Sequence, residues 1–145
     1  MENMPTYKEL KTLAETRLQE AKALSDKNLY DGARYLLGYV VEFALKARIC
    51  KILDMDEYPE TGEISKTFKT HNYDILIKLA GLEKEFDRAK NLSKQLFNNW
   101  STSTMWKEDF RYKPIGTNKM KNFLDAIDAL EDQKDGVFTW IKKWW

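Results

Sequence analysis

The stretch that decides the fold is YDGARYLLGYVVEFALKARICK, which runs from Tyr30 to Lys51. Placed at steps of about 100° per residue, its apolar side chains cover nearly the whole helical circumference. The charged residues that interrupt this surface are Arg34, Glu42, Lys46 and Arg48. A helix that is apolar nearly all round is packed by neighbours on several sides. We therefore predict that residues 30–51 form a buried central helix.

Gly38 lies in the middle of this predicted helix. Glycine in a helix interior costs up to about 1 kcal/mol relative to alanine, so its presence needs a compensating reason. We expect another backbone to approach closely at Gly38, either from a neighbouring helix or from a second subunit. Asn28 stands just before the helix and is of a residue type that favours the N-cap position.

Segments on both sides of the central stretch also carry helical periodicity. The apolar spacing predicts helices over residues 6–24, 73–80 and 83–100, and another from about residue 117. Asn72 is a candidate N-cap and Gly81 a candidate C-terminal stop for the short helix at 73–80. The polar stretches 54–70 and 101–116 show no period and are predicted to be loops. Since no window alternates as a strand does, we predict an all-α fold, a four- to five-helix up-and-down bundle.

Composition sets the remaining limits. The chain of 145 residues is 43% hydrophobic and 32% charged, which suits a single globular domain over residues 1–145. Its formal net charge of +1 gives no overall field that favours DNA or an anionic membrane. Cys50 is the sole cysteine and His71 the sole histidine, so a conventional zinc site is not expected. With no apolar leader or membrane span in the sequence, we expect a cytoplasmic protein whose Cys50 is a buried free thiol.

Three parts of the sequence together resemble one known family. The central helix matches the pattern A-x-Y-L-x-G-Y-x-V-E-x-A-L-K-A at Ala33, Tyr35, Leu36, Gly38, Tyr39, Val41, Glu42, Ala44, Leu45, Lys46 and Ala47. His71 and the apolar residues after it, up to Leu82, are similar to a second family segment, and Trp106 with Arg111 and Tyr112 to a third. On these residues the chain resembles the HEPN family from about residue 24 to residue 140.

The resemblance implies a helical bundle that usually forms a homodimer. Many HEPN proteins are metal-independent ribonucleases of toxin–antitoxin or defence systems, while others bind nucleotides or partner proteins, often beside a nucleotidyltransferase. The ribonuclease branch places an arginine a turn or two ahead of a histidine. In this chain Ile64, Ser65 and Lys66 stand at those places before His71, and a lysine lacks the bidentate fork of arginine.

The charged residues of the central helix supply the candidate site. Glu42 and Lys46 are one helical turn apart and are expected to pair, as a satisfied polar patch would. A buried charge needs a partner, so the same cluster is also where an anionic ligand such as a nucleotide phosphate would bind. The candidate cluster consists of Arg34, Glu42, Lys46, Arg48, His71 and Arg111.

These observations favour a non-catalytic interaction module, a homodimer that binds a partner protein or a nucleotide. No catalytic residue, metal or cofactor is assigned, and no membrane or DNA partner is expected. One alternative is a metal-independent ribonuclease with a degenerate site, in which His71 acts with Lys66 or Arg48. A second alternative is an accessory subunit of a nucleotidyltransferase.

Overall fold

The computed structural model describes residues 4–60 and 66–145, and within these ranges the protein is all-α. Seven α-helices follow one another: α1 (Tyr7–Asp26), α2 (Tyr30–Leu53), α3 (Tyr73–Leu79), α4 (Glu83–Leu92), α5 (Lys94–Thr104), α6 (Met120–Glu131) and α7 (Val137–Lys142). Two short 3-10 helices are also present, η1 (Lys66–Phe68) and η2 (Glu108–Tyr112). The described residues contain no strand, only an isolated antiparallel bridge between Thr6 and Glu57. The predicted all-α class is therefore confirmed, although the described residues form seven α-helices and not four or five.

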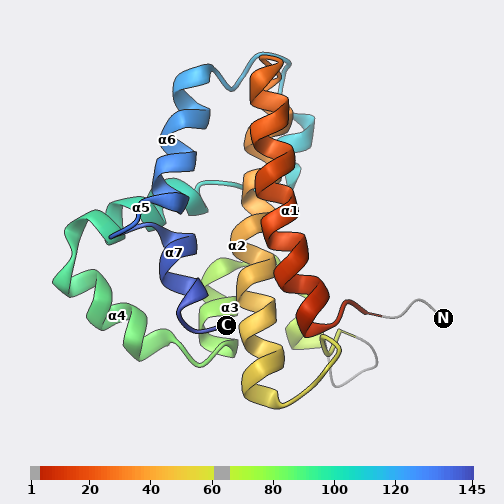
Figure 1. Cartoon of the computed structure of the whole chain (residues 1–145), viewed down its shortest axis with the longest axis vertical. Coiled ribbons are helices and arrows are strands. Elements are labelled where there is room, and N and C mark those ends of the chain that lie inside the picture. Colours follow the sequence, from red (N-terminus) through yellow and green to blue (C-terminus); the bar gives the residue numbers. More distant parts are fainter. Residues whose placement is uncertain (1–3, 61–65) are drawn as a thin grey trace.

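Helix α2 is the central element, as its sequence predicts. It packs against α1 along its length and also contacts α3, α5, α6, α7 and η2. Figure 1 shows α1 and α2 side by side along the long axis, with α4, α5, α6 and α7 on one side of them. Because α2 has neighbours on several sides, thirteen of its residues are buried, among them Glu42 and Lys46.

The structure contains a helix break at Ser93 that the sequence pattern does not predict. The sequence predicts one helix over residues 83–100, whereas the structure has two, α4 and α5, with Ser93 extended between them. The Ser93 hydroxyl accepts a hydrogen bond from the Leu96 N–H at 3.0 Å and so caps α5. The same hydroxyl donates to Asp135 at 2.6 Å, which holds the break in place.

The arrangement is therefore not a simple up-and-down bundle. Figure 1 shows α4 and α5 lying across the direction of α1 and α2, with α6 running roughly along that direction. Part of the predicted loop at 101–116 is helical, since α5 continues to Thr104 and η2 follows. Residues 61–65 of the predicted loop at 54–70 lie outside the described residues. The expected homodimer stays a prediction.

Two of the three predicted helix boundaries are confirmed. The Asn72 side chain accepts from the Ile75 N–H at 3.1 Å and caps α3, and Gly81 follows α3 with a φ of +68°. Asn28 is not the cap of α2, because Leu29 occupies that position without a side-chain hydrogen bond. Asn28 instead adopts a left-handed conformation in the turn between α1 and α2.

Gly38 is needed for a reason that differs from the expected one. A Cβ atom added there would overlap the indole ring of Trp106, not another backbone. Trp106 lies between α5 and η2, is only 3% exposed, and presses its ring onto the glycine. The glycine therefore makes room for a side chain from a segment distant in sequence.

Asp31 ties the segment before α6 to the first turn of α2. Its two carboxylate oxygens accept from the Gly116 N–H at 2.6 Å and from the Asn118 N–H at 2.7 Å. These backbone donors favour the ionised form and lower the pKa of Asp31 below its usual 3.8. A carboxyl group with a depressed pKa stabilises the fold above its unfolded pKa, and this stabilisation is lost as the pH falls through the folded-state pKa.

We expect Asp31→Asn to lower the free energy of unfolding by about 1–2 kcal/mol at neutral pH, because one charged acceptor is lost. The deficit should shrink as the pH falls below 3.8, where the wild-type carboxyl becomes protonated too. Urea unfolding across this pH range measures it. Asp26→Asn, at the exposed end of α1, is the control. A deficit that does not change with pH would contradict the assignment.

Candidate functional site

The polar centre of the molecule is a chain of three side chains that begins on α2. Glu42 and Lys46 pair at 3.2 Å, with side chains only 2% and 6% exposed. The other oxygen of Glu42 lies 2.6 Å from Nδ1 of His71, which is 45% exposed. Since the carboxylate accepts hydrogen bonds, His71 presents the N–H of Nδ1 to Glu42 and is fixed in orientation. The predicted pairing of Glu42 with Lys46 is confirmed.

The segment after α2 closes over Lys46. Glu60 approaches the Lys46 ammonium at 3.8 Å, and the Tyr58 ring lies 4.9 Å from it. The Tyr58 hydroxyl donates to the Phe68 carbonyl at 2.7 Å, which links this segment to η1. Burial, together with the nearby carboxylates of Glu60 and Glu42, raises the pKa of Tyr58, so its hydroxyl stays neutral.

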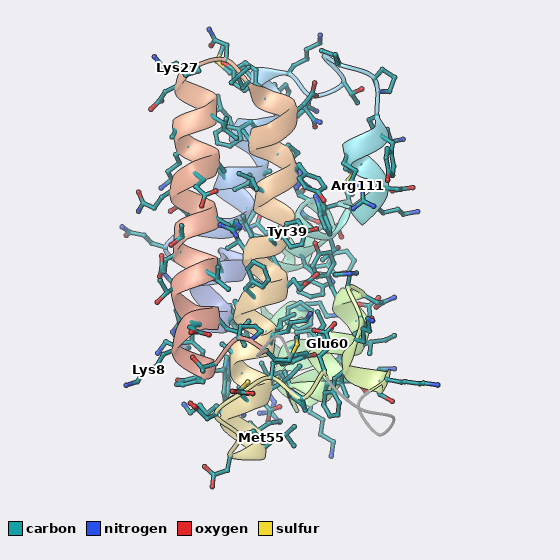
Figure 2. The ribbon with its side chains drawn as sticks, turned by 90° about the vertical axis from the view of Figure 1, so that its right-hand side faces the viewer. Lys8, Lys27, Tyr39, Met55, Glu60 and Arg111 are labelled. Carbon is teal, nitrogen blue, oxygen red and sulfur yellow. The ribbon has the colours of Figure 1, made fainter. Side chains whose placement is uncertain are left out.

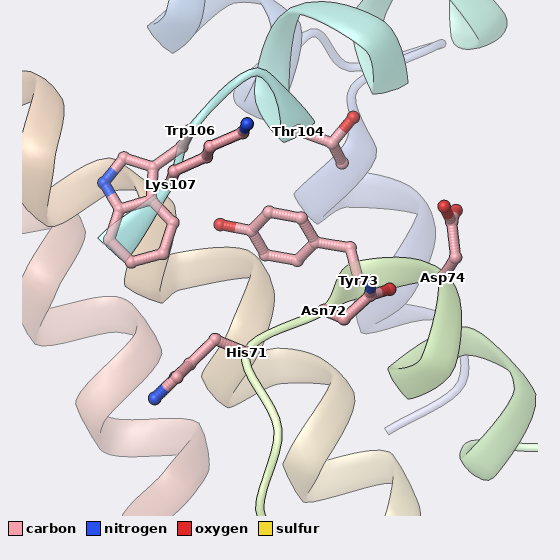
Figure 3. Close-up of a pocket in the computed structure, with 7 residues that line it drawn as sticks. All are labelled: His71, Asn72, Tyr73, Asp74, Thr104, Trp106 and Lys107. Atoms are coloured by element: carbon pink, nitrogen blue, oxygen red, sulfur yellow. The ribbon is translucent and has the colours of Figure 1, made fainter. Parts of the chain in front are cut away.

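Two hollows meet at His71, and we call them together the His71 groove. The first, of about 330 Å³, lies at the start of α3, and Figure 3 shows its lining residues His71, Asn72, Tyr73, Asp74, Thr104, Trp106 and Lys107. The second, of about 500 Å³, lies between the start of α1, the middle of α2 and the segment around Tyr58. His71 lines both, and Glu42 and Lys46 line the second.

Aromatic rings form much of the wall around this groove. Tyr39 and Phe43 stack with their ring centroids 5.5 Å apart, and the Trp106 ring lies 4.9 Å from that of Tyr39. Tyr35 continues this edge of α2, 5.5 Å from both Tyr39 and Trp106. Figure 2 looks onto this side, with Tyr39 on α2 and Arg111 on η2. The groove therefore combines half-buried aromatic faces with one oriented imidazole.

Tyr73 has a packing role. In Figure 3 its ring points toward Trp106, while the His71 ring turns toward α2. The Tyr73 hydroxyl donates to the Gly38 carbonyl at 2.9 Å. Burial strongly raises the pKa of this hydroxyl, so Tyr73 braces the wall as a neutral group.

The three candidate arginines lie outside this centre. Arg48 donates to the carbonyls of Ala80 at 3.3 Å and Trp144 at 3.0 Å, so it fastens the end of α2 to distant segments. Arg111 is exposed on η2, and hydrogen bonds with Tyr112 and Tyr35 raise its pKa. Arg34 is buried and donates to the Thr102 carbonyl at 3.1 Å. The predicted six-residue cluster is therefore not a single pocket.

The sequence interpretation also left out several residues of the groove. Glu60, Tyr58 and Lys107 come from segments predicted to be loops, and no periodicity marked them. Tyr39 and Phe43 did carry a signal, because they stand one turn apart on the same edge of α2 as Glu42 and Lys46. The position of Tyr39 and Phe43 beside Glu42 and Lys46 is therefore the sequence signal that could have identified this surface.

Other classes of site were sought in the described ranges. Within residues 4–60 and 66–145, no group of three or more His, Cys, Asp or Glu side chains is placed to hold a metal ion. No helix in these ranges is long and apolar enough to cross a membrane. Cys50 is buried in α2, as predicted, and burial raises the pKa of its thiol to about 11.

The chain is similar to one known protein family. The family model described as the HEPN domain matches residues 7–132. The chain belongs to the HEPN family. The matched part of the HEPN domain runs from α1 to the residue after α6, so it contains every residue of the His71 groove except Met4 and Pro5. Searches of curated proteins and of solved structures found no match.

Within this HEPN domain, the histidine is accompanied by carboxylate and lysine groups. Lys66 is exposed at the start of η1, while Ile64 and Ser65 lie outside the described residues. The two remaining arginines stand on outer helices, with Arg17 paired to Glu20 on α1 and Arg88 exposed on α4. The charge nearest to His71 in the described geometry is therefore the Glu42 carboxylate.

Proposed function

We propose that this HEPN domain is a non-catalytic binding module and that its His71 groove takes a nucleotide. The observation that carries the proposal is an imidazole held at 2.6 Å by a buried carboxylate and bordered by aromatic rings and Lys107. Glu42 has its charge compensated by Lys46, so it does not repel an anionic ligand strongly. Lys107 supplies a donor for a phosphate, and the imidazolium form of His71 supplies a second through the N–H of Nε2.

The aromatic wall suits the rest of such a ligand. A nucleobase stacks on an exposed aromatic face with about 1–3 kcal/mol of stabilisation, whatever its identity. Tyr39 and Phe43 are half-buried and line the same hollow as His71, so they offer ring surface within reach of the phosphate donors. A flat base against these rings and a phosphate near His71 would use both halves of the groove.

We propose the absence of catalysis because no arginine is placed to act with His71 in the described residues. In the ribonuclease branch that the sequence resembles, an arginine precedes the histidine and stabilises the phosphate charge. Arg48 and Arg111 are held by other partners, and Arg34 lines a separate pocket that His71 does not line. A version of the enzyme in which Arg48 assists His71 is therefore not supported.

A ribonuclease remains the rival because one observation favours it. The Glu42 carboxylate holds His71 by Nδ1, as a carboxylate orients the imidazole of a catalytic dyad. Lys66 is the cation that would have to replace the arginine. The accessory-subunit role, the homodimer and a place in a toxin–antitoxin or defence system also stay predictions.

One set of samples tests the proposal. A fluorescent ATP analogue is titrated into the wild type and followed by anisotropy, and Lys107→Ala and His71→Ala are each expected to weaken binding about tenfold, as loss of one charged contact does. Lys84→Ala, exposed on α4, is the matched control. If neither groove variant changes the affinity, or the wild type does not bind, the groove is not a nucleotide site.

The same samples are incubated with labelled RNA, with and without EDTA. We expect the RNA to stay intact. Cleavage that survives EDTA and disappears in His71→Ala would replace the proposal with the ribonuclease alternative.

A further inference from the structure

Arg34 is a buried cation without a counter-charge. The residue is 6% exposed, and its one hydrogen bond goes from Nη2 to the Thr102 carbonyl at 3.1 Å. In the described part of the chain, no carboxylate lies within ion-pair distance of its guanidinium. A guanidinium has five N–H donors, and one of them is used in the described contacts. Such a group is suited to an anion that comes from outside.

The unused donors are reachable. Arg34 lines a pocket of about 520 Å³ between α5, η2 and α6, a volume that suits a small ligand. Among the described residues, the buried side-chain polar atoms without a partner are Ser103 Oγ, Trp106 Nε1 and Trp144 Nε1. Nε and Nη1 of Arg34 make no hydrogen bond in the described contacts and are not among these sealed atoms, so they keep accessible surface on a residue that lines this pocket.

The rest of the pocket carries the opposite charge. Asp128 on α6 lines it together with Asp125, which pairs with Lys121 at 3.0 Å. Within the described residues, Asp128 has neither an ion pair nor a side-chain hydrogen bond. These carboxylates would repel a doubly charged phosphate more strongly than a singly charged carboxylate. The pocket therefore favours a carboxylate as the anion beside Arg34.

Apolar surface completes the lining. Phe110 from η2 and Met105 after α5 are part of the same pocket. Asn99 is fixed by its donation to the Asp135 carbonyl at 2.8 Å, so this wall is preformed. The pocket thus offers a guanidinium, a carboxylate and an apolar side, which are the complements of the three parts of an amino acid.

We propose that the Arg34 pocket binds a small zwitterion of the α-amino-acid class, with its carboxylate on Arg34 and its ammonium group on Asp128. A bidentate pair between the guanidinium and the carboxylate would supply the missing counter-charge. The site shares no lining residue with the His71 groove, so it stands independently of the proposed nucleotide site.

The test observes Arg34 directly. Arginine Nε–H resonances of the full chain labelled with ¹⁵N are recorded while each common L-amino acid is titrated in separately, with acetate and inorganic phosphate in parallel. The Arg34 signal is assigned by its loss in Arg34→Gln. We expect at least one amino acid to shift this signal, and to do so at a concentration lower by about tenfold than acetate requires.

Variants separate the two ends of the ligand. Asp128→Asn is expected to weaken the amino acid about tenfold and to leave acetate unchanged, because acetate has no ammonium group. Asp26→Asn, exposed at the end of α1, is the matched control and should change neither.

Three results would overturn the proposal. One is that no amino acid shifts the Arg34 signal. Another is that inorganic phosphate binds more tightly than every amino acid. The third is that Asp128→Asn and Asp26→Asn behave alike. If Arg34→Gln does not fold, glutamine variants of Arg17, Arg48, Arg88 and Arg111 assign the other arginine signals, and the Arg34 signal is identified by elimination.

Discussion

Replacing Glu42 with alanine is expected to lower the free energy of unfolding by about 3–5 kcal/mol, the range seen when one partner of a buried ion pair is removed. Lys46 is only 6% exposed, and its nearest remaining carboxylate is Glu60 at 3.8 Å. The lysine would be left in the interior with its charge poorly compensated. His71 would also lose the contact that orients it, so nucleotide affinity should fall in the same variant.

Urea unfolding measures the effect, and a double-mutant cycle isolates its cause. Glu42→Ala combined with Lys46→Met should cost less than the sum of the two single changes, because the uncompensated cation is removed as well. Glu20→Ala breaks an exposed pair with Arg17 and should cost no more than about 1 kcal/mol. If Glu42→Ala costs no more than Glu20→Ala, the buried pair is not the centre of the site.

Gly38→Ala is the second change with a large expected effect. The added methyl group would overlap the Trp106 ring, which is confined by the rings of Tyr35, Tyr39 and Tyr73. Overpacking in a close-packed interior costs about 1–3 kcal/mol and sometimes more. We expect the upper end of this range, because the ring has little space into which to move.

The cause can be isolated within the same helix. Gly32→Ala places its methyl group 3.3 Å from the end of the Leu24 side chain, so it should be nearly neutral. Trp106→Ala alone should cost about 3–5 kcal/mol, and in that background Gly38→Ala should become neutral or favourable, because alanine is the better helix former. Thermal unfolding of the wild type and of these four variants decides this. Equal costs for Gly38→Ala and Gly32→Ala would refute the role of Trp106.

The parts of the fold that follow local rules could be predicted from the sequence. The apolar circumference of residues 30–51 predicts helix α2, and Asn72 and Gly81 predict the two ends of α3. The pairing of Glu42 with Lys46 follows from helical spacing alone. Each of these depends on residues within one or two turns of each other.

The parts set by distant contacts could not be predicted in this way. The break at Ser93 depends partly on Asp135, and the need for Gly38 depends on Trp106. The candidate cluster failed in part for a local reason, because Arg48 is only two residues after Lys46 and must point to another side of α2. The position of Arg111, by contrast, is fixed by where η2 packs, which no spacing within the sequence reveals.

Trp106 constrains how this surface can change during evolution. The Trp106 indole packs against Gly38 and also lines the His71 groove. A substitution of Trp106 that changes the shape of the groove therefore also weakens the packing of the core. Lys107 lines the same groove but is exposed, so it has no such packing role. Relatives that differ in ligand should therefore have diverged at the position equivalent to Lys107, while the tryptophan and the glycine change only as a pair.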